Sequence, residues 1–368
     1  MDETATDVIV IGGGMAGISA AARIAADRKV IVLEAESQIG HHATGRSAAM
    51  FILNYGGRAL RALNAASAPF FADPQGVSDL PLLAPRGEMV IARAGEEQAL
   101  EDYLAASDDM ERLTPDQALA LCPMLRPEAV AGGAAIERNA QEIDVDLMLQ
   151  GFARLLKSLG GQIVTGAPAT AIEWRDEGWH VTTPQGVFTA PVLVNAAGAW
   201  ADQVARLAGI APVGLIPMRR SAAILPEPEG HDMDSWPMVA SAADRWYMKP
   251  MSGKLMVSPC DEDPADAHDA WPDDMVLAEG LDRFSQDTGY EVTRLEHSWA
   301  GLRSFAPDRT PVAGFAPGAK GFLWLAGQGG YGIQTAPAMA QLAADLIAGR
   351  APALSAQAVA ALDPARFS

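Results

Sequence analysis

The sequence predicts an α/β fold, in which one part is a parallel sheet covered by helices and an inserted α+β part is built on an antiparallel sheet. Two observations support this fold class. Three short apolar runs, Val8–Ile11, Val192–Asn195 and Phe322–Ala326, each lead through glycines into a helical pattern, as buried parallel strands do. The stretches between them carry strand patterns and turns, among them the hairpin-like "RWYMKPMSGKLMVSP" with its turn near residues 250–253. We therefore expect one sheet that the chain leaves and rejoins.

Composition and charge narrow the kind of protein. The chain has 368 residues, of which 49% are hydrophobic and 20% charged, which is typical of a globular protein large enough for two domains. The formal net charge of −19 repels nucleic acid and anionic lipid, and no apolar run approaches the roughly 20 residues of a membrane helix. Two distant cysteines, Cys122 and Cys260, indicate a reducing compartment and argue against a structural zinc site. We expect a cytoplasmic protein that acts on a small molecule and holds no metal.

The first apolar run opens a nucleotide-binding motif. Gly12, Gly14 and Gly17 form G-x-G-x-x-G, which allows a tight turn, a close approach to a pyrophosphate and close packing of the helix. The N-terminus of that helix offers free N–H groups to the phosphates. Glu34 follows the next apolar strand, where a carboxylate accepts hydrogen bonds from ribose hydroxyls and disfavours a 2′-phosphate. The sequence therefore predicts a Rossmann-like site for NAD or FAD.

The two later units favour FAD. Val192–Asn195 runs into Gly198 and a helix, and Phe322–Ala326 runs into a loop with four glycines before another helix. Backbone N–H groups at the start of that last helix can stabilise the negative charge on the N1–C2=O edge of a reduced flavin, which a nicotinamide does not need. The alternative for the last loop is a glycine-rich connection without a ligand. Three such units in one chain favour FAD as the cofactor.

Further motifs point to a family. They are "HATGRSAA", "PLLAPRGEMVI", "VNAAGAWAD", "PMRRSAA", "WYMKP", "HSWAGLRSFAPD" and "QGGYGIQT", and they span nearly the whole chain. With them the sequence resembles the D-amino acid oxidase-like FAD-dependent oxidoreductases, a family that includes glycine oxidase and sarcosine oxidase. Within that family it resembles most the branch of bacterial D-arginine dehydrogenases. The resemblance implies FAD, not covalently attached, and the oxidation of an amine that carries a carboxylate.

The resemblance also implies site residues by position. It implies a substrate site formed by Tyr55, Glu88, Arg220, Tyr247, Arg303 and Gly330, of which Tyr55, Arg220, Tyr247 and Arg303 are expected to be catalytic. Besides the glycines named above, it implies an FAD site lined by Ala16, Glu34, Ala35, Ala43, Thr44, Gly45, Arg46, Ser47, Ala48, Ala49, Met50, Ala169, Gly329, Gly330, Tyr331, Gly332, Ile333 and Gln334.

Two arginines and a tyrosine suit a substrate carboxylate. Arg303 lies between apolar and aromatic neighbours, and its planar fork fits a carboxylate with two parallel hydrogen bonds. A structural ion pair is the alternative. In the pair Arg219-Arg220 at most one side chain faces the pocket, because neighbours on a strand point to opposite faces. Tyr247 either hydrogen-bonds the carboxylate or covers the core with a wet hydroxyl.

Other polar residues have two interpretations each. Glu88, in the apolar strand "GEMVIA", suits a cationic substrate side chain, and Asp244 is expected to add to it. The alternative for both is a solvated strand end. His41 and His42 suit acid–base chemistry or covalent attachment of the flavin, or they are plain surface or cofactor packing.

Met50 departs from the D-arginine dehydrogenase pattern, which has a histidine there. Methionine neither takes nor gives a proton, so we expect water or bulk base to accept the proton of the substrate amine, with a rate that rises with pH. Met50 is also expected to border the substrate and to favour larger apolar D-amino acids. "AAMFILNYGG", residues 48–57, is then half core and half pocket wall, with Tyr55 at the pocket mouth.

The predicted FAD domain is discontinuous and comprises residues 1–78, 143–212 and 304–368. Residues 79–142 and 213–303 form the predicted substrate domain, with "LPEPEG" and "CDEDPADAHDAWPDD" as surface loops. The predicted reaction is oxidative deamination of D-amino acids by hydride transfer from Cα to flavin N5, giving an imino acid and then a 2-keto acid and ammonia. The alternatives are an oxidase or dehydrogenase of N-methyl amino acids, opines or 2-hydroxy acids, and a flavin-binding electron-transfer subunit. The electron acceptor, a quinone, a dye-like compound or oxygen, stays open.

Overall fold

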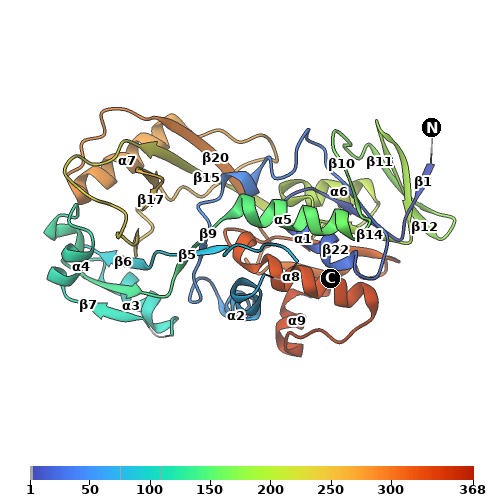
Figure 1. Cartoon of the computed structure of the whole chain (residues 1–368), viewed down its shortest axis with the longest axis horizontal. Coiled ribbons are helices and arrows are strands. Elements are labelled where there is room, and N and C mark those ends of the chain that lie inside the picture. The colour runs from blue at the N-terminus through green and yellow to red at the C-terminus, as the bar shows by residue number, and fades with distance from the viewer. Residues whose placement is uncertain (1–2, 75, 109) are drawn as a thin grey trace.

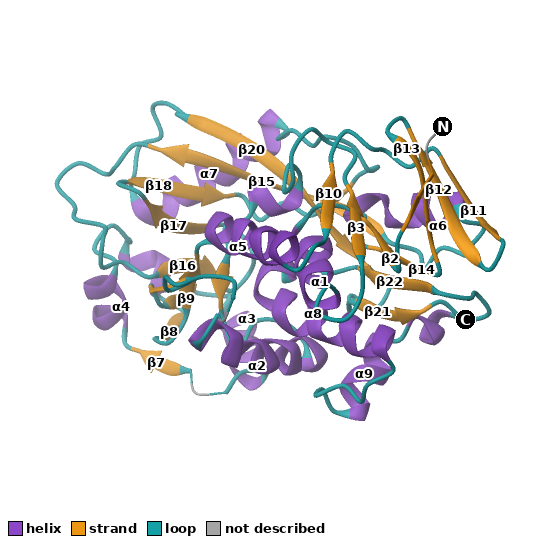
Figure 2. Cartoon of the chain, turned by 45° about the vertical axis from the view of Figure 1, so that its right-hand side comes forward, coloured by secondary structure: helices purple, strands orange, loops and turns teal. Residues whose placement is uncertain are grey.

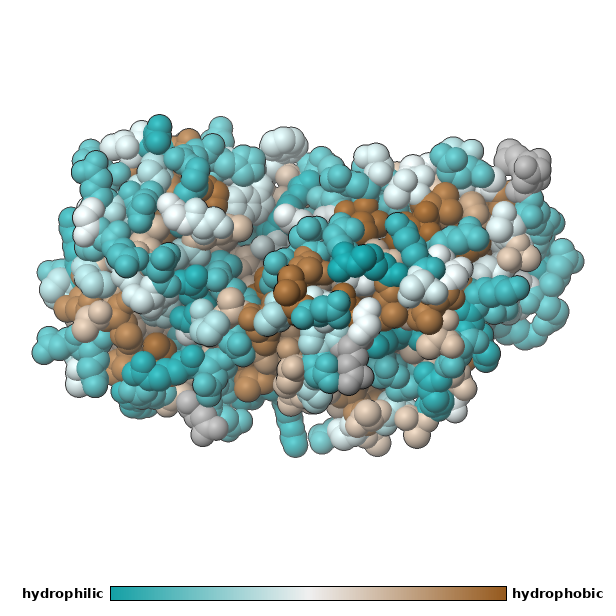
Figure 3. Space-filling model, viewed as in Figure 1, coloured by the Kyte–Doolittle hydropathy of each residue, from teal (hydrophilic) through white to brown (hydrophobic). Residues whose placement is uncertain are grey.

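The computed structural model describes residues 3–74, 76–108 and 110–368. Within this part of the chain the strands form four sheets, and the predicted α/β architecture is confirmed. Figure 1 shows an elongated molecule, with the strands of the glycine-motif part on the right and those of the large antiparallel sheet on the left. The face seen in Figure 3 is mostly hydrophilic, and its apolar side chains lie in separate groups.

The three strands that the apolar runs predict are neighbours in one six-stranded sheet. Its order is β10 (Gln162–Val164), β3 (Val30–Leu33), β2 (Val8–Ile11), β14 (Val192–Asn195), β22 (Phe322–Ala326) and β21 (Val312–Phe315). The first five strands are parallel, and only the edge strand β21 runs antiparallel to its neighbour. Parallel pairing brings the carboxyl ends of β3, β2, β14 and β22 to the same edge of the sheet, where the glycine-rich turns follow.

Each face of this sheet is buried under a different layer (Figure 2). Val8 and Val10 of β2 face a core formed with helices, whereas Ile9 and Ile11 face a core formed with a second sheet. Alternate side chains of a strand point to opposite faces, so a run that is apolar throughout requires cover on both sides. The helical layer is α1 (Met15–Ile24), α2 (Arg58–Ala72), α5 (Val145–Ser158), α8 (Gly332–Ala348) and α9 (Ala356–Leu362). The other layer is β1 (Glu3–Ala5), β13 (Gly186–Ala190), β12 (Gly178–Thr183), β11 (Ala171–Arg175) and α6 (Ala201–Leu207).

The large sheet is mostly antiparallel and draws its strands from two distant stretches of sequence. Only its pair β16–β6 is parallel among the described strands. One face packs against helices, and the other face carries Tyr247 and Met256 toward the first part of the molecule. The strands in order are β19 (Asp263–Pro264), β15 (Ile216–Leu225), β18 (Lys254–Ser258), β17 (Tyr247–Met251), β16 (Met238–Ser241), β6 (Glu88–Ala92), β8 (Gly133–Glu137) and β7 (Glu111–Leu113), with β20 (His297–Phe305) paired to β15. The helices are α3 (Glu97–Ala105), α4 (Pro115–Leu121) and α7 (Asp274–Thr288).

Short elements join the two parts. A three-stranded sheet is formed by β4 (Met50–Phe51), β9 (Gln141–Ile143) and β5 (Leu83–Pro85). The 3-10 helices are η1 (Ala43–Arg46), η2 (Pro127–Val130), η3 (Gly198–Trp200) and η4 (Pro364–Phe367). No helix in the described part of the chain is long and apolar enough to cross a membrane. The boundaries of the two domains stay a prediction.

Two local predictions can be compared with the structure. The hairpin is confirmed as β17–β18, and its turn residues Ser252 and Gly253 both have positive φ, at 51° and 72°, as a two-residue type I′ turn requires. The interpretation of the acidic segment as a surface loop is confirmed, because most of its residues are exposed. Its residues Asp263 and Pro264 pair with β15, and His268 and Ala270 line a cavity. The segment is therefore an exposed loop that also borders the cavity, which composition alone did not predict.

Candidate functional site

A cavity of about 410 Å³ lies at the carboxyl ends of the parallel strands. Its wall includes Gly12 after β2, Glu34 after β3, Ala196 after β14 and Gln328 after β22. The opposite wall comes from the large sheet, including Arg220 of β15. Ligands of open parallel sheets bind at this edge, because the loops and helix N-termini that follow the strands meet there.

One end of the cavity is the nucleotide motif. Gly12 has φ 109°, and a Cβ on it would lie 2.4 Å from the carbonyl oxygen of Ala196. A Cβ on Gly17 would lie 1.9 Å from the carbonyl oxygen of Gly12, so the motif packs as its spacing predicts. Helix α1 has no side-chain cap at Gly14, although Thr44 accepts a hydrogen bond from the N–H of Met15 at 3.0 Å. The uncapped helix N-terminus therefore faces the cavity and suits phosphate.

Glu34 is held in place by backbone groups. Its Oε2 accepts a hydrogen bond from the N–H of Gly13 at 2.5 Å, and its Oε1 accepts one from the N–H of Glu36 at 2.8 Å. Its side chain is buried yet lines the cavity beside Ala35 and Ala169. This arrangement leaves further lone pairs of the carboxylate for ribose hydroxyls.

The other end of the cavity is bordered by the loop between β22 and α8. Gly329, Gly330 and Gly332 line it, and α8 begins without a side-chain cap. Ser304 Oγ and Gln328 Nε2 are buried and have no hydrogen-bond partner among the described residues, although both residues line the cavity. Unpaired buried polar groups need an explanation, and the carbonyl and ring nitrogen atoms of an isoalloxazine offer suitable partners. The residues present therefore fit FAD at both ends of the cavity.

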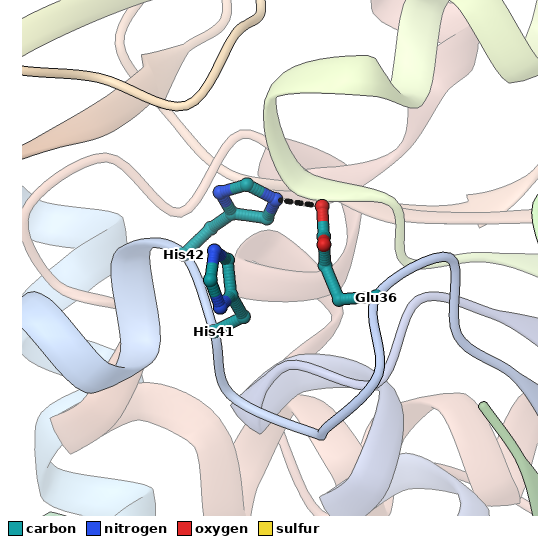
Figure 4. Close-up of side chains that lie close together, drawn as sticks. All are labelled: Glu36, His41 and His42. Carbon is teal, nitrogen blue, oxygen red and sulfur yellow. Dashed lines mark hydrogen bonds and ion pairs between the residues drawn. The ribbon is translucent and has the colours of Figure 1, made fainter. Parts of the chain in front are cut away.

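His41 and His42 belong to the cavity wall, and Figure 4 shows their side chains beside that of Glu36. The Nε2 of His42 lies 2.9 Å from Oε1 of Glu36. Asp269 of the acidic segment lies 3.6 Å from Nε2 of His41 and 3.8 Å from Nδ1 of His42. Arg46 donates a hydrogen bond to Asp269 and holds the pKa of that carboxyl below its usual range. The histidines thus tie the acidic segment to the rim of the cavity.

Glu36, His41 and His42 also have the geometry of a possible metal site, since their ligand atoms lie within 4.8 Å of one another. Two features disfavour a cation there. The Nε2 of His42 is already hydrogen-bonded to Glu36, and the guanidinium of Arg46 adds positive charge through its contact with Asp269. We therefore assign these side chains to the wall of the cavity.

The large sheet places two arginines at the far end of the cavity. Arg303 of β20 and Arg220 of β15 lie on paired strands and both line the cavity. Arg303 has no hydrogen bond or ion pair to a carboxylate within the described residues, so the alternative of a structural ion pair does not apply there. Arg220 has Glu262 at 3.8 Å, and its Nε lacks a partner among the described residues. Its neighbour Arg219 instead contacts Asp263 at 2.9 Å, away from the cavity.

Three tyrosines lie around these arginines. Tyr247 is buried, lines the cavity and packs in one apolar cluster with Met50. The ring of Tyr55 lies 4.7 Å from that of Tyr331, and Tyr55 packs against the same cluster as Met50. Burial raises the pKa of Tyr55, while the positive charge of Arg303 acts in the opposite direction. Tyr55 is therefore close enough to the guanidinium to feel its charge, and its place at the pocket mouth stays a prediction.

Glu88 is buried at the start of β6, behind Tyr55. Its backbone lies opposite Glu137 of β8, and its Oε2 accepts a hydrogen bond from the hydroxyl of Tyr103 at 3.0 Å. Burial and the neighbouring charge of Glu137 raise the pKa of Glu88 to about 7, against the lowering effect of the Tyr103 hydrogen bond. Glu88 is not a solvated strand end. Asp244 differs, because it is exposed in the turn between β16 and β17, as its alternative interpretation requires.

The predicted site residues therefore divide into two groups. The first group lines the cavity: Gly12, Gly14, Ala16, Glu34, Ala35, Ala43, Thr44, Arg46, Ser47, Ala48, Ala169, Gly198, Arg220, Tyr247, Arg303, Gly329, Gly330, Gly332 and Ile333. The second group does not form part of that wall: Gly17, Gly45, Ala49, Met50, Tyr55, Glu88, Asp244, Tyr331 and Gln334. In this second group Gly45 and Asp244 are exposed, and the others are buried or half-buried.

The sequence did not point to several residues that border or support the cavity. Trp200 packs against His42 with ring centroids 4.5 Å apart, and His268 reaches the wall from the acidic segment. Lys249 is buried and donates a hydrogen bond to the carbonyl oxygen of Ala48 at 2.8 Å, while Glu142 lies 2.8 Å from its Nζ. A lysine in the apolar strand "WYMKPM" was a usable signal, because a buried ammonium needs a partner.

Comparison with known proteins agrees with this geometry. A family model described as FAD dependent oxidoreductase matches residues 7–346. Glycine oxidase of Bacillus licheniformis is 26% identical over 371 residues, which cover 93% of this chain and 93% of that protein. These similarities do not single out the D-arginine dehydrogenase branch.

Solved structures share the fold. Glycine oxidase from Geobacillus kaustophilus superposes with a TM-score of 0.84 at 21% identity and covers 97% of this chain and 98% of its own. L-proline dehydrogenase from P. horikoshii superposes with a TM-score of 0.85 at 22% identity and covers 100% of this chain and 98% of its own. The fold of this chain is therefore shared with these two enzymes.

Proposed function

The chain belongs to the family of FAD-dependent oxidoreductases, and from that premise we propose that it oxidises the Cα–N bond of an α-amino acid, with D-amino acids preferred. The observation that carries the proposal is the pair Arg303 and Arg220 at one end of the FAD cavity, with Arg303 lacking a carboxylate partner among the described residues. A guanidinium in such a place requires an anion, and a substrate carboxylate supplies it.

FAD is the cofactor of this family, and the residues of the cavity fit it. We assign Glu34 to the ribose, the N-terminus of α1 to the pyrophosphate and the loop before α8 to the flavin ring. When bound, FAD supplies the oxidant that takes a hydride from the substrate Cα. His41 and His42 lie at the rim, and we expect the cofactor to be held without a covalent bond.

The substrate is held by its carboxylate. Arg303 presents a planar fork, Arg220 adds a second positive charge, and we expect the hydroxyl of Tyr247 to donate a hydrogen bond to the same anion. Holding the carboxylate at fixed points orients Cα relative to the flavin end of the cavity, and such orientation itself lowers the barrier. Tyr55 closes the pocket from the side of Tyr331.

The substrate amine must lose a proton before oxidation. Met50 is buried in the cluster around Tyr247 and has no basic atom, so we expect water or bulk base to accept that proton. Glu88 has a pKa near 7 and is the group to test against this expectation. If the rate of the Glu88→Gln variant still rises with pH, water is supported, whereas a flat profile assigns the proton to Glu88.

The side-chain pocket is expected to reach Glu88. This carboxyl is buried behind Tyr55, and glycine or another small substrate has no side chain that could contact it. We therefore favour a substrate with a long side chain, apolar or cationic, over the glycine and L-proline named in the relatives. The product is an imino acid, which water hydrolyses to a 2-keto acid and ammonia.

Anaerobic flavin bleaching tests the proposal. Purified protein is mixed with D-arginine, D-lysine, D-leucine and D-methionine, with their L-forms, and with glycine, sarcosine, L-proline, an opine and a 2-hydroxy acid. Rapid bleaching by D-amino acids with long side chains is expected. Bleaching by glycine, sarcosine or L-proline alone would refute the side-chain assignment, and bleaching by none of the amino acids would refute the proposed function.

The physiological acceptor needs a separate measurement. Steady-state production of hydrogen peroxide distinguishes an oxidase from a dehydrogenase that passes electrons to a quinone or a dye-like acceptor. An electron-transfer subunit without substrate chemistry is the third possibility, and Arg303, which has no carboxylate partner in the described part of the chain, argues against it. A cytoplasmic location stays a prediction.

A further inference from the structure

The loop that carries Tyr55 is held by side chains from three other elements. It comprises residues 52–55, directly after β4. The N–H of Ile52 donates to Oε1 of Gln334 on α8 at 3.0 Å. The Nδ2 of Asn64 on α2 donates to the carbonyl oxygens of Ile52 at 3.2 Å and Tyr55 at 3.1 Å. Buried side chains thus satisfy backbone groups that neither a helix nor a sheet pairs.

The third support is Glu137, at the end of β8 in the large sheet. Its Oε1 accepts a hydrogen bond from the N–H of Leu53 at 2.9 Å. Its Oε2 accepts from the N–H of Asn54 at 3.3 Å and from Nδ2 of Asn54 at 2.7 Å. Every partner is a donor, which suits a carboxylate rather than a carboxamide, because a carboxamide would turn an NH₂ group toward an N–H.

Asn54 extends this contact to a further segment. Its Nδ2 donates to the carbonyl oxygen of Asp108 at 2.7 Å, and its Oδ1 accepts from the N–H of Asp108 at 2.7 Å. Asp108 follows α3, the helix that carries Tyr103. The hydroxyl of Tyr103 is the hydrogen-bond donor to Glu88. The Glu137–Asn54 pair is therefore linked through Asp108 and α3 to the Tyr103–Glu88 pair.

Glu137 and Glu88 lie opposite each other on β8 and β6, and both are buried. The two carboxyl groups are not equivalent in their partners. Glu137 accepts three hydrogen bonds from N–H groups, whereas Glu88 accepts one from Tyr103. The carboxylate of Glu137 therefore has more hydrogen-bond donors around it than that of Glu88, and its negative charge disfavours a second charge on Glu88. The titratable groups that face Glu88 are Glu137 from β8, Tyr103 from α3 and Tyr55 from the loop.

We propose that Glu137 is a positioning residue that sets both the place of Tyr55 and the charge of Glu88, and so decides whether the pocket accepts a neutral or a cationic substrate side chain. The proposal rests on the proposed function, because it requires a substrate whose side chain approaches Glu88. When Glu88 is protonated and neutral, the pocket accepts an apolar substrate side chain. A cationic substrate side chain stabilises the ionised form of Glu88.

The pH dependence follows from the direction of the shift. The pKa of Glu88 is raised to about 7, by burial first and by the charge of Glu137 second. Preference for a cationic chain over a neutral one of equal length is therefore expected to grow as pH rises through about 7. Replacing Glu137 by glutamine removes the second cause of the raised pKa of Glu88. The increase in preference for the cationic side chain is therefore expected at lower pH in this variant.

The test uses the FAD-loaded enzyme and two substrates of matched length, D-lysine and D-norleucine. The ratio of their kcat/KM values is measured against pH in the wild type and in Glu137→Gln, Glu88→Gln and Glu111→Gln. Glu111 is the matched control, because it is an exposed glutamate on β7 of the same sheet that pairs with Arg138. In Glu137→Gln the midpoint of the ratio moves to lower pH, and KM rises about tenfold for both substrates as the Tyr55 loop shifts. In Glu88→Gln the ratio becomes independent of pH, while Glu111→Gln matches the wild type.

Two results overturn the proposal. One is a Glu137→Gln enzyme that binds FAD and keeps both the wild-type KM values and the wild-type midpoint. The other is a Glu88→Gln enzyme whose ratio still changes with pH. If Glu137→Gln does not fold, the Glu88→Gln profile alone decides, since a pH-dependent ratio there excludes the role given to Glu88.

A second readout does not depend on turnover. Amide hydrogen exchange at Leu53 and Asn54 is expected to be about tenfold faster in Glu137→Gln than in the wild type and unchanged in Glu111→Gln. Equal exchange in all three proteins contradicts the positioning role. If no amino acid bleaches the wild-type flavin, the proposed function fails, and faster exchange in Glu137→Gln still supports the structural half of the inference.

Discussion

The guanidinium of Arg303 packs directly against the backbone of Gly330. A Cβ placed on Gly330 would lie 3.1 Å from Nη1 and 3.2 Å from Cζ of Arg303, closer than side chains normally approach. Gly330 belongs to the loop that precedes α8, at the end of the cavity that we assign to the flavin, and Arg303 belongs to the large sheet. The loop assigned to the cofactor therefore forms one wall of the site assigned to the substrate carboxylate.

The first prediction concerns this contact. In Gly330→Ala the new methyl group displaces the guanidinium by a few tenths of an ångström, so KM for the amino acid rises about tenfold or more while FAD stays bound. Steady-state kinetics and the flavin content of the purified protein measure the two effects. Gly57→Ala is the control, because a Cβ there meets no heavy atom within 4 Å. Loss of FAD with an unchanged KM would show that Gly330 serves the cofactor instead.

The second prediction concerns Arg303 itself. Arg303→Lys keeps the positive charge but loses the planar fork, so the proposed reaction is expected to lose about 10² to 10⁴-fold in the rate of flavin reduction at low substrate. Rapid mixing without oxygen measures this rate. Arg219 lies on the neighbouring strand, where it pairs with Asp263 outside the cavity. The Arg219→Lys variant should therefore behave like the wild type. Equal losses in both variants would argue that the sheet, and not the carboxylate site, is perturbed.

The third prediction concerns Glu34 and the cofactor. Glu34→Gln replaces one acceptor oxygen by an NH₂ group, which faces either the N–H of Gly13 or that of Glu36. We expect the dissociation constant for FAD to rise about 10 to 100-fold, as measured by quenching of flavin fluorescence. Glu173→Gln, at an exposed glutamate on β11, is the matched control. A dissociation constant that does not change would remove Glu34 from the cofactor site.

The fourth prediction concerns stability and pH. The pKa of Glu88 rises from its ordinary 4.5 to about 7 in the folded protein, so the unfolded chain gives up this proton more easily. The contribution of protonated Glu88 to the free energy of unfolding is complete below pH 4.5 and is lost as pH rises through about 7. Glutamine has no proton to lose, so the stability of Glu88→Gln relative to the wild type should increase by about 3 kcal/mol between about pH 4 and pH 8.

Urea unfolding of the FAD-free protein at several pH values measures this difference. Glu173→Gln serves again as the comparison, because its carboxylate is exposed. A difference between Glu88→Gln and the wild type that stays constant with pH would mean that Glu88 titrates normally in the folded protein.

The sequence by itself determined the nucleotide part of this protein. The glycine spacing around Gly12 and Gly17, the acid at Glu34 and the three apolar runs identified the strands and turns where the structure has them. These features are local, because turn geometry and strand burial depend on residues within one strand-turn-helix unit. The hairpin at β17–β18 was predictable for the same reason, since its two turn residues determine how the strands pair.

Only the tertiary structure decided which polar residues share the end of the cavity that we assign to the substrate. Arg219 and Arg220 are equivalent in sequence, yet pairing with β19 directs Arg219 to Asp263 while Arg220 lines the cavity. Glu88 begins an apolar strand, and Asp244 precedes one. Glu88 is nevertheless buried opposite Glu137, whereas Asp244 is exposed in a turn. Burial and charge at these positions depend on which strands become neighbours, and that pairing joins residues far apart in the chain.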